Sequence, residues 1–144
     1  MQNVFDAKDA QEYINRINNL TPETQRKWGK MSVDQVLAHL NVAYDLTFTP
    51  EKFPKPSFIA KFLLSRFVKP KITNEIPYKQ SLPTSPAFII ADERNFEEEK
   101  AKLIGNIQRV QQLGREAFEG KENINFGKMT AQCWNNMFAK HLNH

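Results

Sequence analysis

The chain has 144 residues, a formal net charge of +4 and one cysteine, Cys133. This length suits a single domain, residues 1–144, with one hydrophobic core. One cysteine excludes an intramolecular disulfide and a thiolate zinc cluster, and it is typical of a reducing compartment. No apolar run reaches the length of a membrane span, and no signal-peptide pattern opens the sequence, so we expect a soluble cytoplasmic protein.

Helical periodicity dominates the sequence, and strand alternation is almost absent. In chain order, it predicts a helix over residues 7–19, a second that begins at Ser32, a third that begins near Asp92 and a fourth that begins at Thr130. Gly114 is the expected end of the third helix, because glycine commonly terminates helices. We therefore expect an all-α fold.

A connection of more than forty residues separates the second and third helices and contains seven of the eight prolines. Residues 58–68 within it have the pattern of a short extra helix, while the other two connections are much shorter. Short, long and short connections are typical of an up-down-down-up four-helix bundle with one long crossover. We expect the crossover helix to close one end of the bundle by burying its aromatic side chains.

The crossover is also the basic part of the chain, since positions 50–80 contain seven Lys or Arg and two Glu. A basic surface can attract nucleic acid or anionic lipid. No nucleic-acid-binding motif accompanies it, so we expect a solvated face and no nucleic-acid partner. An interfacial amphipathic helix over residues 58–68 is the alternative.

Two helices open with nearly the same five residues, at 28–32 and 126–130: an aromatic residue, Gly, Lys, Met and then a hydroxyl. Ser32 and Thr130 are suited to cap these helices. Counted from those caps, His39, His141 and His144 point in directions that span only about 60°. If the two helices run antiparallel, His39 and His141 also meet at one level along the axis, since each residue rises ~1.5 Å. Imidazoles collected in this way can bind a divalent transition metal.

This combination of two matching helix entrances with His39, His141 and His144 resembles the DinB-like superfamily, and within it an uncharacterised branch of the YfiT-like metal-dependent proteins. The resemblance covers essentially the whole chain. It implies a bundle with a long crossover and a metal held by one histidine of the second helix and two of the last. It also implies, as in some members, thiol transfer with a low-molecular-weight thiol.

The three histidines are not equally suited to bind a metal. The family's last-helix histidines usually have three residues between them, whereas His141 and His144 have two, and His144 is the final residue. We therefore expect His39 and His141 to be the better ligands. Zinc or nickel suits nitrogen ligands. Gln35 lies one turn before His39 and could hydrogen-bond to a histidine ligand and so orient it. An exposed polar residue on a helix is its more ordinary role.

Two functions remain in competition. The first is a metal-dependent enzyme that transfers a thiol or hydrolyses a small-molecule substrate, because a bound metal lowers the pKa of water or of a thiol. The second is a metal-free binding module whose basic, aromatic crossover contacts an anionic surface or partner. A homodimer that shares bundle faces is compatible with either.

Overall fold

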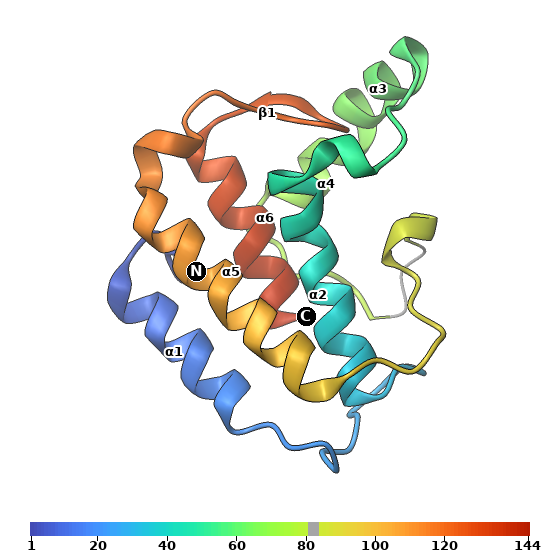
Figure 1. Ribbon diagram of the computed structural model, residues 1–144. Coiled ribbons are helices and arrows are strands. Elements are labelled where there is room, and N and C mark those ends of the chain that lie inside the picture. The colour runs from blue at the N-terminus through green and yellow to red at the C-terminus, as the bar shows by residue number, and fades with distance from the viewer. Residues whose placement is uncertain (81–83) are drawn as a thin grey trace.

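The computed structural model describes residues 1–80 and 84–144 and is mostly helical (Figure 1). Long helices alternate with short helical turns, and one pair of short strands precedes the last helix. In chain order the elements are α1 (Ala7–Asn18), α2 (Val33–Phe48), the 3-10 turn η1 (Pro50–Lys52), α3 (Phe58–Leu63), the π-helical turn η2 (Leu64–Val68), α4 (Lys69–Thr73), the 3-10 turn η3 (Pro86–Phe88), α5 (Phe96–Phe118), β1 (Lys121–Asn123), β2 (Gly127–Met129) and α6 (Ala131–Asn143).

The prediction of an all-α, up-down-down-up four-helix bundle is wrong. Strands β1 and β2 pair antiparallel, with Lys121 opposite Met129, so the second of the two matching entrances is a strand. The Asn123 side chain accepts hydrogen bonds from the backbone N–H groups of Asn125 and Phe126, which closes the turn between the strands. Gly127 follows with a φ of 71°, a conformation that glycine tolerates. Strands of three residues are too short to show alternation in the sequence.

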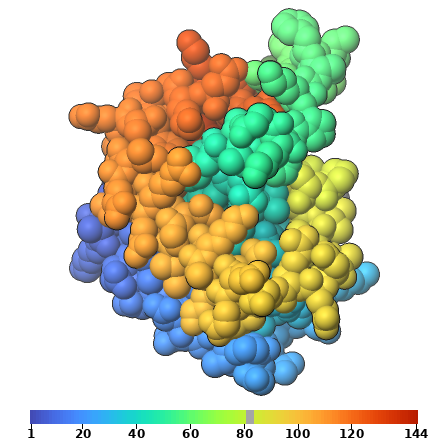
Figure 2. All heavy atoms as spheres, in the orientation of Figure 1, coloured from blue at the N-terminus to red at the C-terminus, as the bar shows by residue number. Residues whose placement is uncertain are grey.

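The crossover also differs from the prediction. The expected short helix at 58–68 is formed by α3 and η2, and helical structure continues beyond it through α4 to Thr73. Its first part, α3, projects from the body and forms the light green knob in the space-filling view (Figures 1 and 2). Phe58, Phe62 and Phe67 are exposed there, so the expected burial of the crossover aromatics is wrong.

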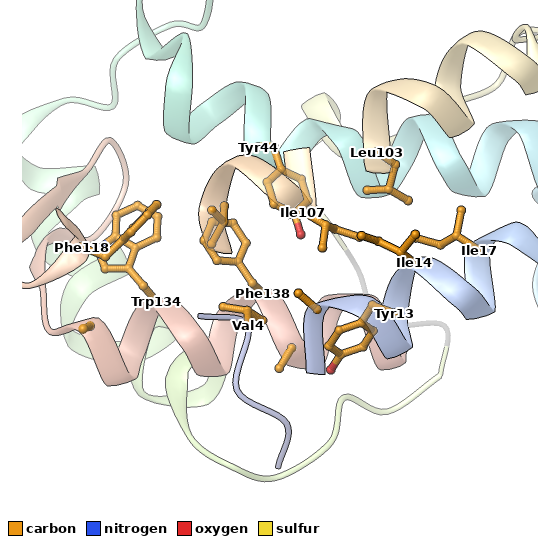
Figure 3. Close-up of a cluster of buried hydrophobic side chains, with 14 of the residues drawn as sticks. Val4, Tyr13, Ile14, Ile17, Tyr44, Leu103, Ile107, Phe118, Trp134 and Phe138 are labelled. Carbon is orange, nitrogen blue, oxygen red and sulfur yellow. The ribbon is translucent and has the colours of Figure 1, made fainter. Parts of the chain in front are cut away.

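The main core lies where α1, α2 and α6 pack against the long helix α5 (Figure 3). In α1 the predicted apolar face is buried, and its N-cap Asp6 accepts a hydrogen bond from the Asp9 N–H. Aromatic rings fill the other end of the core: Tyr44 stacks on Phe138 with ring centroids 4.8 Å apart, and Phe118 meets Trp134 edge to face. Most of this core could be predicted from the 3.6-residue spacing.

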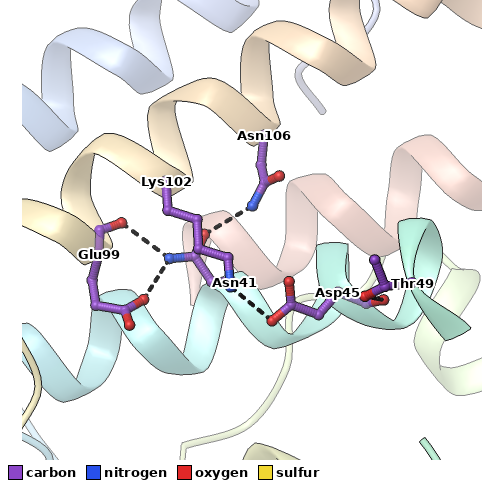
Figure 4. Close-up of polar contacts among 6 residues, drawn as sticks. All are labelled: Asn41, Asp45, Thr49, Glu99, Lys102 and Asn106. Carbon is purple, nitrogen blue, oxygen red and sulfur yellow. Dashed lines mark hydrogen bonds and ion pairs between the residues drawn. The ribbon is translucent and has the colours of Figure 1, made fainter. Parts of the chain in front are cut away.

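A buried polar network joins α2 to α5 (Figure 4). The Asn41 side chain is fully buried and donates to the Glu99 carbonyl and carboxylate, while its oxygen accepts from the Asn106 amide. Lys102 forms an ion pair with Asp45 one turn further along. A buried amide is stable only when its donors and acceptor are satisfied, and here each is, so the network sets the register of the two helices.

Helix α5 begins and ends later than predicted. Its N-cap is Asn95, whose side chain accepts from the Glu98 N–H, three residues past the predicted start at Asp92. Gly114, the predicted end, has a φ of 79° and a ψ of 170°, which breaks the helical path. Helical structure resumes and continues to Phe118, which is buried in the core. Burial of this ring favours the extra turn beyond the break.

The end of the crossover is held against α6 by buried polar side chains. Lys140 donates to the Lys71 carbonyl and to the Asn74 side chain, and Asn136 donates to the Thr73 carbonyl. These acceptors lie at the C-terminal end of α4, where carbonyl groups lack helical partners and a positive charge is favourable. This anchoring determines where residues 74–80 pass beside the end of α6.

Candidate functional site

His39 of α2 and His141 of α6 face each other near the edge of the core. Their Nε2 atoms are 3.0 Å apart, and their ring centroids are 4.8 Å apart with the planes at 67°. The two helices begin one residue after the predicted caps, Ser32 and Thr130. Thr130 accepts a hydrogen bond from the Cys133 N–H, so this cap helps to set the register of α6. The structure thus brings together the two histidines expected to be the better ligands.

Phe88, in the turn η3, orients this pair. The Nδ1 atom of His39 lies 2.7 Å from the Phe88 carbonyl oxygen. A carbonyl only accepts, so His39 donates from Nδ1, and its Nε2 is the atom that faces His141. The Phe88 ring also packs edge-on against both imidazoles, with centroids 5.5 Å from each. The sequence did not indicate a role for Phe88, because no local pattern connects a short 3-10 turn with a histidine 49 residues earlier.

The electrostatics of the site favour the neutral form of His141. Burial, reinforced by the neighbouring His39 and His144, lowers the pKa of His141 to about 3. The pKa of His144 is lowered too, by partial burial and by His39. At neutral pH His141 therefore lacks a second proton, and a neutral imidazole is the form that binds metals.

The third expected ligand has a different setting. His144 follows the last residue of α6, is exposed, and packs against the rings of Trp28 and Tyr78 at centroid distances of 4.7 and 5.6 Å. Across residues 1–80 and 84–144, no three His, Cys, Asp or Glu side chains form a cluster that could hold a metal ion. The pair His39 and His141 is thus close, and His144 does not complete a triad with it in this conformation.

Gln35 is used elsewhere. Its side-chain oxygen accepts from the Ser32 N–H, and its amide donates to the Asp92 carbonyl. Both ends of the amide thus tie the start of α2 to the segment that leads into α5. We expected Gln35 to orient a histidine, but it is the Phe88 carbonyl that orients His39.

The spacing of the histidine pair can be compared with metal coordination. With metal–nitrogen bonds of about 2.0–2.1 Å, two ligands lie about 3.4 Å apart at the tetrahedral angle and about 2.9 Å apart at a right angle. The observed 3.0 Å falls between these values. Two imidazoles whose Nε2 atoms face each other at this distance fit a divalent transition metal as two of its ligands, and the remaining positions would be open to His144, water or substrate.

A pocket of about 220 Å³ lies at the end of α6, with Trp28, Tyr78, Lys140 and His144 in its lining. The Lys140 ammonium group lies 4.4 Å from the centroid of the Tyr78 ring, an arrangement that stabilises the cation. Trp28 and its matching residue Phe126 therefore differ in role, because Trp28 contacts His144 whereas Phe126 packs on the core. The volume of the pocket suits a small molecule.

Fold and site together define a mostly helical domain in which the imidazoles of two separate helices meet, with His144 in the lining of a small pocket at the end of the last helix. The chain belongs to the family described as "Protein of unknown function (DUF1569)", whose model matches residues 2–144. No curated protein and no solved structure matches the chain. Within the part of the chain that the structure describes, no helix combines the length and apolar character needed to cross a membrane.

Proposed function

We propose that this protein is a divalent-metal-dependent enzyme of the DinB-like kind, with His39 and His141 as its principal metal ligands. The observation that carries the proposal is the facing pair of Nε2 atoms at 3.0 Å, one of them held in place by the Phe88 carbonyl. Metal-binding histidines generally donate their other ring N–H to a carbonyl or carboxylate, which is the arrangement of His39. The metal would be zinc or nickel, both of which suit nitrogen ligands.

In this proposal His144 is the third ligand and reaches the metal by rotating away from Trp28 and Tyr78. His144 follows the last residue of α6 and is exposed, so a rotation of this side chain disturbs no core packing. A bound zinc or nickel ion would supply Lewis acidity, which lowers the pKa of a water molecule or a substrate thiol.

The protein's own residues would prepare the site for this chemistry. The Phe88 carbonyl orients His39, and burial keeps His141 unprotonated. The pocket lined by Trp28, Tyr78 and Lys140 would receive a small substrate. We propose a low-molecular-weight thiol as co-substrate and either thiol transfer or hydrolysis as the reaction. A cytoplasmic location would keep that thiol and Cys133 reduced.

Metal content decides the proposal. The purified protein is loaded with zinc or nickel, dialysed, and analysed for bound metal by mass spectrometry, alongside His39→Ala and His141→Ala. We expect near-stoichiometric metal in the natural protein and a drop in affinity of about 10-fold to 100-fold or more in each variant, since ligand loss exceeds the effect of losing a supporting residue. Equal metal content in all three proteins would show that the pair is only a hydrogen bond.

Two controls distinguish the loss of a metal ligand from the loss of the folded structure. Gln35→Ala changes a polar residue one turn from His39 whose side chain is occupied elsewhere, so it should retain the metal. Far-ultraviolet circular dichroism of each variant reports whether the helices remain. His144→Ala should lose less affinity than either principal-ligand variant, because its position is the most mobile of the three.

A further inference from the structure

The projecting part of the crossover, residues 58–68, exposes an unusual amount of apolar surface. We call this segment, which comprises α3 and η2, the arm. Phe58 is 88% exposed, Ile59 70% and Phe62 60%, with Leu63, Phe67 and Val68 also exposed. Six of the ten large apolar side chains exposed in the described structure belong to the arm. A contiguous patch of this kind usually marks a contact with another molecule or with a membrane.

The arm is turned so that a charged side chain, not its apolar side, meets the body. Lys61 forms an ion pair with Glu122 of β1, with Nζ and Oε1 2.6 Å apart, and Lys69 just beyond the arm donates to the Lys128 carbonyl of β2. At about 100° per residue, Phe58, Ile59, Phe62 and Leu63 lie within about 140° of one another, and Lys61 lies outside that sector. A surface helix ordinarily buries its apolar side, whereas the arm exposes its apolar side to solvent.

The segment that carries the apolar side is rich in positive charge. Residues 52–74 contain six Lys or Arg and no Asp or Glu. Arg66 lies beside the Phe67 ring, with its guanidinium carbon 5.6 Å from the ring centroid. An apolar stripe bordered by cations matches an anionic bilayer, where acyl chains receive the apolar groups and lipid phosphates receive the charges. A second copy of the chain would bring like charges together, which opposes association.

We propose that the arm docks on anionic lipid surfaces, with Phe58, Ile59 and Phe62 inserted among the headgroups and Arg66 at the lipid phosphates. The protein lies on the membrane in this proposal and does not span it. The shape of α3 favours the same contact, because it stands clear of the body and the rest of the molecule does not obstruct it (Figure 2). The histidine site is not involved, so this inference and the proposed function can fail separately.

Vesicle co-sedimentation tests the proposal. Phosphatidylcholine vesicles with and without phosphatidylserine are mixed with the natural protein at low and high salt. We expect binding to the phosphatidylserine vesicles to exceed binding to pure phosphatidylcholine by about tenfold or more and to weaken with salt, because each cation near the surface contributes. Equal binding to both vesicle types, or none at low salt, overturns the proposal.

Matched variants identify the surface. Phe58→Ser combined with Phe62→Ser should reduce the partition coefficient about tenfold or more, since buried apolar area drives insertion. Ile76→Ser is the control, because Ile76 is 69% exposed and lies outside the arm. Arg66→Glu should weaken binding only to the anionic vesicles. These positions are exposed, so all variants should fold.

Light scattering, run in parallel, examines the competing occupant. A concentration-dependent dimer that the double serine variant abolishes would mean that a second copy covers the arm, and it would overturn the membrane proposal. A monomer at all concentrations, together with vesicle binding that depends on Phe58 and Phe62, supports it. In the co-sedimentation assay, His39→Ala should bind vesicles as the natural protein does. That result would show that the arm acts independently of the histidine pair.

Discussion

The Nε2 atoms of His39 and His141 lie 3.0 Å apart although 102 residues separate them in the chain. Two bare lone pairs would repel at this distance, so one of the two nitrogens must carry a hydrogen when no metal is present. His39 donates from Nδ1 to the Phe88 carbonyl, and in the tautomer that carries only this proton its Nε2 is the acceptor. We therefore expect His141 to be the donor in the metal-free protein.

This assignment predicts opposite tautomers for two adjacent histidines. In the metal-free protein, long-range nitrogen–proton correlation spectra should show His39 protonated at Nδ1 and His141 protonated at Nε2. Addition of zinc should remove the Nε2 proton of His141 and shift the Nε2 signals of both rings, since a metal takes the place of that proton. An Nε2-protonated His39 would contradict the role assigned to Phe88.

The buried amide of Asn41 should be among the most sensitive polar positions. Asn41→Ala removes two hydrogen bonds to Glu99 and leaves Asn106 without its partner, so we expect a loss of about 2–4 kcal/mol in the free energy of unfolding. Asn106→Ala should cost about 1 kcal/mol, because Asn106 is only partly buried and water can replace it. Urea unfolding measures both, and equal effects would contradict the central position of Asn41.

Two glycines of α5 should respond to alanine in opposite directions. Gly114 has a φ of 79° and a ψ of 170°, a region nearly restricted to glycine, so Gly114→Ala should cost about 1–3 kcal/mol. Gly105 is helical and exposed, with open space where a Cβ would lie, so Gly105→Ala should stabilise by about 0.5–1 kcal/mol. Thermal unfolding compares them directly. A stabilising Gly114→Ala would mean that the break in α5 is not required.

Alkaline pH should destabilise the fold through Tyr13. Burial raises the pKa of Tyr13 above its ordinary value of 10.0, despite a hydrogen bond from Asn143 that lowers it. The folded state thus keeps this proton at a pH where the unfolded chain has released it. The stabilising effect is complete below about pH 10 and is lost as the pH rises through the higher pKa of the folded state.

The variant Tyr13→Phe tests this linkage. It should be less stable at neutral pH by about 1 kcal/mol, because it loses its hydrogen bonds to Gln2 and Asn143. Its stability should then fall less steeply above about pH 10 than that of the natural protein. The decline will not disappear, since burial also raises the pKa of Tyr44. Parallel curves for the two proteins would show that Tyr13 does not contribute.

Local sequence patterns were reliable for the long helices. The apolar spacing in residues 7–19 predicted α1 to within a residue, and Ser32 and Thr130 correctly marked the starts of α2 and α6. These signals are reliable because helix periodicity and capping depend on neighbours within one turn. Counting from the caps, together with the assumption that the two helices run antiparallel, predicted that His39 and His141 would share a level. Their metal binding remains a prediction.

The same local reasoning was wrong about the hairpin and the arm. Strands β1 and β2 depend on pairing between Lys121 and Met129, which no three-residue pattern reveals. The arm has the periodicity of a helix that buries its apolar side, yet Lys61 instead meets Glu122. An amphipathic pattern shows that a helix has two sides and does not specify which one faces the protein.

What the sequence determined by itself was the set of long helices, the faces they bury and the positions of His39 and His141 on two of them, because each depends on residues a turn apart. Only the tertiary structure decided which histidines meet and how they are oriented. It placed the Phe88 carbonyl on His39, set His144 against Trp28 and Tyr78, and engaged Gln35 at the start of α2. Such contacts join segments far apart in the chain, and their geometry follows from packing that no local pattern encodes.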